Sequence, residues 1–228
     1  MTHDDDPRGY ASPPCSLHEF DHPAGTDDVA AWRRSERKRL IALRRALGRR
    51  ERAVLDAGIE RGLDTLLGDV AGLAIAVYWP IRGEPDLRGW CARAADRGAR
   101  LALPVVQARN SPLVFCRWRP GERLVPGALK IPVPAACDAL EPAVILSPLV
   151  GYDRQRHRLG NGGGYYDRTL AALAGRPLTI GVGYERCALR SIYPQSFDVP
   201  MDYIVTESSV DPAPGEADWR RQLRTSTG

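Results

Sequence analysis

The sequence predicts an α/β fold built on a largely parallel sheet. Short apolar runs of strand length alternate along the chain with stretches of helical periodicity. Several of these runs are apolar throughout, which is typical of parallel strands buried on both faces. The 228 residues, 43% of them hydrophobic, suffice for one domain with a buried core. We expect that domain over residues 29–207, after a disordered or loosely docked leader at 1–28 and before a C-terminal tail at 208–228.

Two amphipathic helices are expected first. Asp27 or Asp28 is placed to cap a helix that runs toward Leu47. The second helix ends near Gly68 and has apolar residues at helical spacing, namely Leu55, Ile59, Leu63 and Leu66.

The strands follow, separated by shorter helices. Apolar or alternating runs predict strands over residues 72–78, 100–106, 113–118, 143–150, 177–184 and 203–206. Helices are expected over 86–97 and 165–173, and a proline-rich connection occupies 120–142. Ligands of parallel sheets bind at the carboxyl ends of the strands. The candidate binding segments are therefore those that follow strands, at 79–84, 152–167 and 184–198.

The most informative stretch is a glycine-rich loop. Residues 158–168 read Arg-Leu-Gly-Asn-Gly-Gly-Gly-Tyr-Tyr-Asp-Arg, and four of the seven residues in 160–166 are glycine. Glycine reaches positive φ and leaves backbone N–H groups unobstructed, so the loop can form a concave nest that binds anions. The dipole of the helix expected next adds to the attraction for phosphate. A tight turn remains the alternative, and the loop matches neither a P-loop nor a dinucleotide fingerprint.

Charged side chains flank this loop. Arg158 and Arg168 favour a bound phosphate, whereas Asp167 would repel it unless a divalent metal lies between them. No convincing nucleophile arrangement is present, because His157 is the only histidine beyond the leader. Phosphoryl transfer needs no protein nucleophile and relies on positioning and charge neutralisation, which fits this composition.

The first predicted helix is strongly basic. Residues 33–52 contain ten basic side chains against Glu36 and Glu51, whereas residues 1–28 hold seven acidic ones. Three interpretations are open: a solvated face, a clamp for a polyphosphate, or a contact with nucleic acid. No aromatic residues interleave with the arginines and no known nucleic-acid-binding motif occurs. We therefore expect no nucleic-acid partner.

Composition also argues against a membrane protein and a disulfide scaffold. No stretch approaches the ~20 apolar residues of a membrane span, and the acidic N-terminus is unlike a signal peptide. We expect no membrane partner and a cytoplasmic location. The five cysteines contain no Cys-x-x-Cys pair, which favours reduced, mostly buried thiols. Cys15 and His18 in the leader are metal-ligand types, but without a second pair a polar tail is the favoured interpretation.

Together these residues resemble the 5-formyltetrahydrofolate cyclo-ligase family, also called 5,10-methenyltetrahydrofolate synthetases. The resemblance covers about residues 33–207 and is most specific at 158–168, preceded by Ser-Pro-Leu-Val-Gly-Tyr-Asp at 147–153. Its supports are Tyr78-Trp-Pro with Glu84 and the segments 180–184, 194–198 and 204–207. The resemblance implies a three-layer α/β fold with helices on both faces of the sheet, like that of sugar-phosphate isomerases and acyl-CoA transferases.

The resemblance also implies the reaction. ATP and Mg²⁺ are required, and 5-formyltetrahydrofolate becomes 5,10-methenyltetrahydrofolate with release of ADP and phosphate. The formyl oxygen attacks the γ-phosphorus to give an imidate phosphate, N10 of the folate closes the ring, and phosphate leaves. The protein holds the formyl oxygen in line with ATP and neutralises charge on the transferring group.

Individual residues acquire roles from the same resemblance. ATP contacts fall on Arg33, Arg37, Arg158, Leu159, Gly160, Asn161, Gly162, Gly163, Gly164, Tyr165 and Tyr166. Substrate contacts fall on Trp79, Glu84, Asn161, Gly162, Gly163, Gly164 and Tyr165. Arg158 and Asp167 are the expected catalytic residues, and Asp167 and Asp198 the expected Mg²⁺ ligands. Arg33 and Val133 depart from the family pattern, which commonly has lysine and glutamate at these positions.

Two other classes of function compete with this one. A sugar-phosphate isomerase on the same layered fold would need a catalytic base and no ATP site. A nucleic-acid-binding protein would use residues 33–52, show steep salt dependence and leave the glycine loop unused. We expect a monomer whose partners are the small molecules ATP and 5-formyltetrahydrofolate.

Overall fold

A seven-stranded sheet lies at the centre of the fold. The computed structural model describes residues 25–212, and the strands of this sheet follow the order β12-β11-β9-β6-β1-β2-β3. Their bounds are β1 (Ala74–Ala76), β2 (Arg100–Val106), β3 (Leu113–Arg117), β6 (Val144–Pro148), β9 (Leu178–Val182), β11 (Tyr203–Val205) and β12 (Val210–Pro212). The inner strands run parallel, whereas β3 and β12 pair antiparallel at the two edges. The predicted largely parallel sheet is confirmed.

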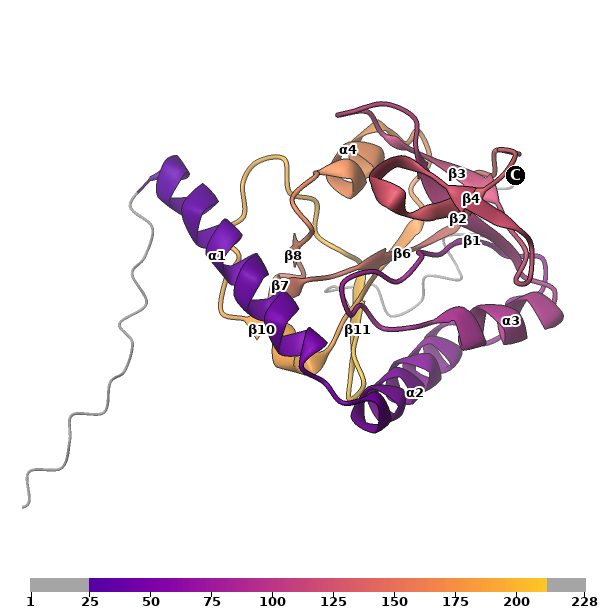
Figure 1. The fold of residues 1–228 in the computed structure, drawn as a ribbon, viewed down its shortest axis with the longest axis horizontal. Helices are drawn as coiled ribbons and strands as arrows, with labels where there is room; N and C mark the ends of the chain where they lie inside the picture. The colour runs from indigo at the N-terminus through magenta and orange to yellow at the C-terminus, as the bar shows by residue number, and fades with distance from the viewer. Residues whose placement is uncertain (1–24, 213–228) are drawn as a thin grey trace, which may run out of the picture.

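Helices pack against the sheet. Their bounds are α1 (Thr26–Arg45), α2 (Arg49–Leu67), α3 (Arg88–Asp96) and α4 (Tyr165–Ala172). The core between α2, α3 and the sheet includes Ile59, Trp90 and Leu101. The core beneath α4 includes Ile145 with Leu170, and Figure 1 shows α4 on the other side of the strands from α2 and α3. Successive strand residues face opposite sides, which is why an all-apolar strand can serve both cores.

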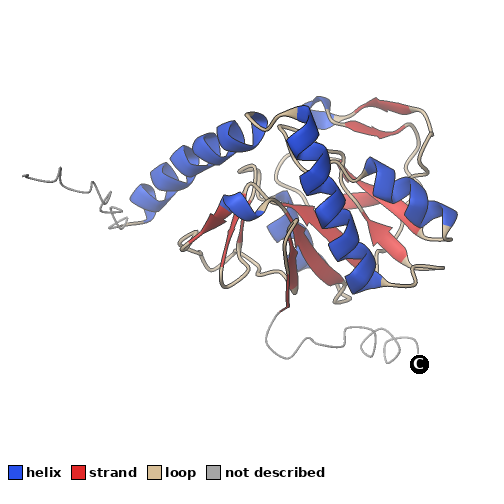
Figure 2. Ribbon diagram, turned by 90° about the horizontal axis from the view of Figure 1, so that it is seen from below, coloured by secondary structure: helices blue, strands red, loops and turns tan. Residues whose placement is uncertain are grey.

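Helix α1 lies differently from the other three. Leu40 in its C-terminal half, and Leu47 just after its end, belong to the same core as Ile59 and Trp90. Its N-terminal half projects past the layers around the sheet, as Figure 2 shows. This position carries the arginines of α1 along the side of the molecule where β7 and β8 lie.

Several short elements were not predicted. A second sheet of order β10-β7-β8 joins Ala188–Leu189, Gly151–Asp153 and Arg158–Leu159. The proline-rich connection contains a hairpin of β4 (Leu124–Pro126) and β5 (Pro132–Pro134) around a short 3-10 helix, Ala128–Lys130; a second 3-10 helix spans Glu185–Cys187. Strands of two or three residues are too short to give a periodic signal.

The end of the folded region also differs from the prediction. Strand β12 pairs with β11 in the register Val205↔Val210, and the Thr206 amide donates to the Ser209 carbonyl at 2.9 Å. Residues 210–212 therefore belong to the sheet, and residues 208–209 to the turn before it, which corrects the tail that was predicted over 208–228. Residues 213–228, and the leader up to residue 24 with Cys15 and His18, lie outside the described residues.

The cysteines require a second correction. Cys116 and Cys137 form a disulfide with their Cα atoms 4.8 Å apart, so the expectation of reduced thiols is wrong for this pair. The connection folds back on β3, where an isolated bridge joins Cys116 and Ala139, and this return brings the two thiols together. Cys91 and Cys187 are buried thiols as expected, and burial raises the pKa of Cys91 to about 12.

Among the described helices, none combines the length and apolarity that a membrane crossing requires.

Candidate active site

The glycine loop connects β8 to α4. Gly162 and Gly164 have φ values of 97° and 63°, so the predicted positive φ occurs at these two positions. Gly164 is the residue immediately before the first turn of α4. At Gly163 the need for glycine has another cause, since a Cβ there would lie 2.7 Å from Cδ2 of Tyr165. The loop is thus a tight, glycine-dependent entrance to a helix.

Arg37 of α1 lies against this loop. Its Nε donates to the Gly160 carbonyl at 2.8 Å, and its Cζ would be 3.6 Å from a Cβ placed on Gly162. Burial lowers the pKa of Arg37, and the neighbouring positive charge of Arg33 lowers it further. A cation held under such repulsion gains from a bound anion.

Arg158 and Asp167 form an ion pair at the opposite end of the loop. Arg158 Nη2 lies 2.7 Å from Asp167 Oδ1, and Arg158 is only 5% exposed. The amide of Val199 also donates to Asp167 Oδ1, at 3.2 Å, and Arg158 Nη1 donates to the Val199 carbonyl at 3.2 Å. Burial lowers the pKa of Arg158, and Asp167 opposes that shift. Asp167 Oδ2 accepts no bond from the described residues and stays available to a ligand.

Arg33 and Asp198 form a second ion pair next to the first. Arg33 Nη2 lies 2.5 Å from Asp198 Oδ2, and Nη1 lies 3.3 Å from Oδ1. The Gln195 amide also donates to Asp198 Oδ2, at 2.7 Å. Asp198 directly precedes Val199, whose amide is bound to Asp167. The carboxylates of Asp167 and Asp198 therefore lie close to the same peptide unit. Arginines already neutralise both, so carboxylates beside the loop do not by themselves demand a metal.

Glu84 connects the segment after β1 to the glycine loop. Its Oε1 accepts a hydrogen bond from Asn161 Nδ2 at 3.0 Å, and its Oε2 accepts one from the Ile81 amide at 3.0 Å. The carboxylate is 3% exposed, and burial raises its pKa while Ile81 and Arg44 oppose the shift. The structure therefore brings together two predicted site residues that lie 77 positions apart.

Comparison with known proteins assigns the chain to one family. The model of the 5-formyltetrahydrofolate cyclo-ligase family matches residues 29–207. The 5-formyltetrahydrofolate cyclo-ligase of Mycolicibacterium smegmatis is 34% identical over 179 residues, 72% of this chain and 91% of that protein. The Escherichia coli protein of the same name is 35% identical over 144 residues, 60% of this chain and 79% of that protein. The chain belongs to the 5-formyltetrahydrofolate cyclo-ligase family.

Solved structures agree with the assignment of the chain to this cyclo-ligase family. The 5,10-methenyltetrahydrofolate synthetase of Mycoplasma pneumoniae is 25% identical with a TM-score of 0.64, and covers 77% of this chain and 98% of its own. The Aquifex aeolicus synthetase is 28% identical with a TM-score of 0.68, and covers 79% and 92%. The activity is that of a 5-formyltetrahydrofolate cyclo-ligase, a ligase of folate one-carbon metabolism, and the predicted family is confirmed.

Arg44 is a residue of this site that the sequence analysis did not single out. It is 1% exposed, and its Nη2 lies 3.4 Å from Glu84 Oε1. Its other nitrogens donate to the carbonyls of Arg82 and Leu149, both at 2.8 Å. A signal was present, because Arg44 lies four residues after Leu40 on the buried face of the predicted helix. Helical spacing places such a residue inside, where it must be paired.

The three predicted aromatic residues of the candidate site lie in different surroundings. Tyr165 lies under the guanidinium of Arg168, at 5.2 Å, and Tyr166 lies against Arg158 at 5.7 Å. Burial raises the pKa of Tyr166. Trp79 lies edge-on to Trp118, with ring centroids 6.2 Å apart, and 5.4 Å from the guanidinium of Arg88. The ring of Trp79 thus contacts α3 and the segment after β3. The role of Trp79 as a substrate contact stays a prediction.

Proposed function

We propose that this family member phosphorylates the formyl oxygen of 5-formyltetrahydrofolate with ATP at the glycine loop, and that ring closure then expels the phosphate. Family membership implies ATP and 5-formyltetrahydrofolate as the substrates. The observation that carries the proposal is the convergence of Arg37, Arg158 and the glycine-rich N-terminus of α4 on one loop. Backbone amides, a helix dipole and guanidinium groups are the means by which proteins bind phosphate.

The ATP site in this proposal spans residues 158–166 together with Arg33 and Arg37. Arg37 has donor nitrogens beyond the one bound to Gly160, and these can reach phosphate oxygens. Arg33 acts at one remove, because its nitrogens are bound to Asp198 and to the Ile192 and Tyr193 carbonyls. Arg33 then fixes the segment 192–198 against α1, and Arg37 carries the direct contact.

Mg²⁺ fits the carboxylates near the loop, though not equally. Asp167 is 19% exposed and has Oδ2 available, whereas Asp198 is 6% exposed and has both oxygens engaged. Mg²⁺ is usually held by one or two carboxylates with phosphate oxygens and water. We assign Asp167 as the main protein ligand and Asp198 as a second one that must first release Arg33. The ion would neutralise phosphate charge during transfer.

The folate would lie between the glycine loop and the segment after β1. Glu84 presents an acceptor that suits the N–H groups of a pterin ring, and Asn161 holds that carboxylate beside the loop. Asn161, Gly162 to Gly164 and Tyr165 then contact both substrates, as the family resemblance implies. Trp79 supplies an apolar surface at the same end of β1.

The chemistry then needs only positioning and charge neutralisation. Attack of the formyl oxygen on the γ-phosphorus releases ADP, and N10 next attacks the formyl carbon, so that phosphate leaves and N10 loses its proton. Arg158 and the loop amides would stabilise charge on the transferring phosphoryl group. Asp167 would orient Arg158 through their ion pair.

The packing of α2 and α3 on one side of the sheet and α4 on the other supports the three-layer fold of sugar-phosphate isomerases and acyl-CoA transferases. Ligand sites of such folds lie at the carboxyl ends of the strands, where the glycine loop and Glu84 lie. The isomerase alternative gains no support, since the ionisable groups at the loop are paired carboxylates and arginines.

The test is a direct assay with purified protein. Mixing it with Mg-ATP and 5-formyltetrahydrofolate should produce the absorbance band of the methenyl product and an equal amount of ADP. ADP should not accumulate when the folate is left out. Arg37→Gln should raise the KM for ATP about tenfold, the effect expected from losing one charge-assisted contact. ATP hydrolysis without folate, or no product from folded protein, would contradict the proposal.

A further inference from the structure

A pocket lies at the other end of the sheet from the glycine loop. Its volume is about 540 Å³, and it is formed by the C-terminal half of α3, the start of β2 and the segment after β3. Strand β2 begins at Arg100 and runs parallel to β1, so this pocket is at the amino ends of the parallel strands. Glu84 and the glycine loop, in contrast, come after the carboxyl ends of the parallel strands β1 and β6. A ligand in this pocket would therefore occupy a place separate from the glycine loop, while its lining residue Trp118 packs against Trp79 with ring centroids 6.2 Å apart.

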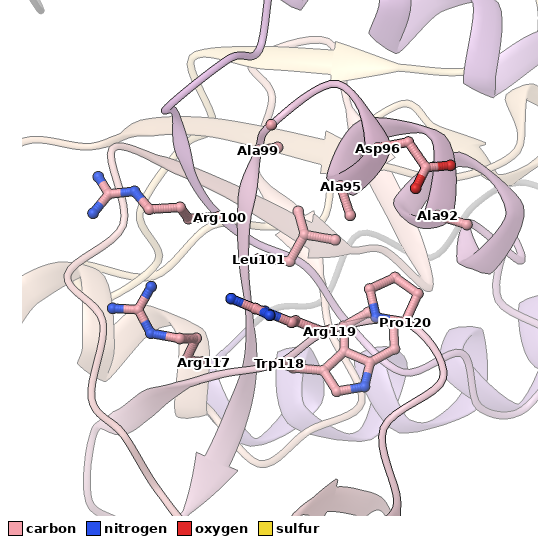
Figure 3. A pocket seen from close by; sticks show the side chains of 11 residues that line it. Ala92, Ala95, Asp96, Ala99, Arg100, Leu101, Arg117, Trp118, Arg119 and Pro120 are labelled. Carbon is pink, nitrogen blue, oxygen red and sulfur yellow. The ribbon is translucent and has the colours of Figure 1, made fainter.

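Three arginines make one side of the pocket basic. Figure 3 shows the guanidinium groups of Arg100, Arg117 and Arg119 on one side, with the carboxylate of Asp96 across the pocket. Arg117 is paired with Asp138 at 2.7 Å. Within residues 25–212, neither of the other two arginines forms an ion pair. Glu122 also lies nearby, where its Oε2 accepts a hydrogen bond from the Arg119 backbone amide at 3.1 Å. The guanidinium groups of Arg100 and Arg119 are thus the charges of this cluster that the described part of the chain leaves without an ion-pair partner.

The pairing of β2 with β3 places these charges close together. Ala102 lies opposite Arg117, and the Trp118 amide donates to the Leu101 carbonyl at 2.9 Å, so Arg100 and Arg119 lie at the open end of the ladder. Like charges that face each other across antiparallel strands are destabilising. An anion bound between the guanidinium groups would replace this repulsion with charge-assisted hydrogen bonds.

The rest of the pocket is mainly apolar. Ala95, Leu101, Trp118 and Pro120 contribute to its lining. Trp118 is 5% exposed, and its indole N–H is buried without an acceptor among the described residues. Buried donors usually have a partner, and among the described residues that line the pocket this N–H is the buried side-chain donor without one.

We propose that this pocket binds an organic anion that has an apolar body and at least one carboxylate or phosphate group. Guanidinium groups recognise both head groups, since each offers a pair of oxygens to the two-nitrogen edge of arginine. The volume lies in the range of about 300 to 1,000 Å³ that holds small organic ligands. The apolar lining would bind the body of the ligand.

The first experiment is calorimetric titration of the full chain with four probes. These are phenyl phosphate, phthalate, inorganic phosphate and the neutral benzyl alcohol, each with and without saturating Mg-ATP. Phenyl phosphate or phthalate should bind in both conditions, more tightly than inorganic phosphate, and benzyl alcohol should not bind. The tighter of the two aromatic anions identifies the head group. Binding of neither, or complete displacement by Mg-ATP, would overturn the proposal, because displacement would assign the anion to the glycine loop.

Variants then locate the bound anion. Arg119→Gln and Arg100→Gln should each weaken binding about tenfold, as expected for the loss of a charge-assisted contact. Arg61→Gln, which removes an exposed arginine of α2 outside the pocket, is the matched control and should bind like the parent chain. Trp118→Phe should remove the change in tryptophan fluorescence that accompanies binding. Equal affinities of the Arg119→Gln, Arg61→Gln and parent proteins would show that the anion binds elsewhere.

Discussion

Asn161 in the glycine loop donates its side-chain amide to the buried carboxylate of Glu84 at 3.0 Å, which joins the two halves of the proposed site. Because the bond ties the phosphate-binding loop to the group assigned to the folate, it fixes the separation of the two substrates. Positioning of this kind is the main contribution a protein makes to phosphoryl transfer. The same carboxylate is held from behind by Arg44 and the Ile81 amide.

Asn161→Ala should therefore reduce kcat/KM for 5-formyltetrahydrofolate about tenfold, because the loop and the carboxylate would no longer hold the two substrates in a fixed geometry. The melting temperature should change little, because Glu84 keeps its bonds to Ile81 and Arg44. Steady-state kinetics and thermal unfolding measure the two quantities. Asn161→Asp should be worse, as it places a second carboxylate beside Glu84. Unchanged kinetics in both variants would show that the bond between Asn161 and Glu84 does not position the substrates.

The glycine loop offers a matched pair of substitutions. A Cβ on Gly163 would meet the Tyr165 ring at 2.7 Å, whereas a Cβ on Gly160 would have no atom within 4 Å, and neither residue has positive φ. Gly163→Ala should displace Tyr165 and raise the KM for ATP, and Gly160→Ala should leave it nearly unchanged. Calorimetric titration of each variant with nucleotide measures the difference. A KM for ATP that both substitutions leave unchanged would mean that the loop tolerates a side chain at Gly163.

The two carboxylates near the loop should respond differently to neutralisation. Asp167→Asn should raise the Mg²⁺ concentration needed for half-maximal turnover, because Oδ2 of Asp167 is available to a ligand. Asp198→Asn should mainly lower the melting temperature, since it leaves the buried Arg33 without its carboxylate partner. Magnesium titrations and unfolding of both variants check this division. If Asp198→Asn shifted the magnesium dependence as strongly as Asp167→Asn, the two carboxylates would be equal ligands and the assignment of Asp167 as the main one would be wrong.

Asp56 predicts a pH dependence of stability. Burial raises its pKa above the ordinary value for aspartate, although the Tyr184 hydroxyl donates to it at 2.7 Å. A folded-state pKa above the unfolded value stabilises the fold below the unfolded pKa, and this stability is lost as pH rises through the folded pKa. The free energy of unfolding of Asp56→Asn, taken relative to the parent chain, should thus increase between pH 4 and neutrality. Denaturant unfolding at several pH values measures it, and a constant difference would contradict the assignment.

Local pattern was enough to predict six of the seven strands of the central sheet, all but β12, and the glycine loop. β2 spans its predicted range, residues 100–106, because an apolar run bounded by arginine and a loop has a strong signal. The glycine loop was placed between a strand and a helix from composition alone, and its positive φ values occur at Gly162 and Gly164. The requirement at Gly163 was not predictable, since it depends on the orientation of the Tyr165 ring.

Contacts between distant segments lay beyond the sequence patterns. Arg33 and Asp198 are 165 residues apart, and no local feature indicates that α1 passes the segment at 192–198. For the same reason the bridge between Cys116 and Cys137 was missed, because it requires the proline-rich connection to return to β3. Arg44 shows the intermediate case, in which helical spacing indicated burial but could not name Glu84 as the partner.

The most direct test of the account follows the formyl oxygen. In the proposed mechanism this oxygen attacks the γ-phosphorus and leaves with the phosphate when N10 closes the ring. 5-Formyltetrahydrofolate labelled with ¹⁸O in the formyl group should therefore transfer its label to the phosphate released with ADP, as measured by mass spectrometry of that phosphate. Phosphate that carries no label, formed together with the methenyl product, would contradict phosphorylation of the formyl oxygen at the glycine loop.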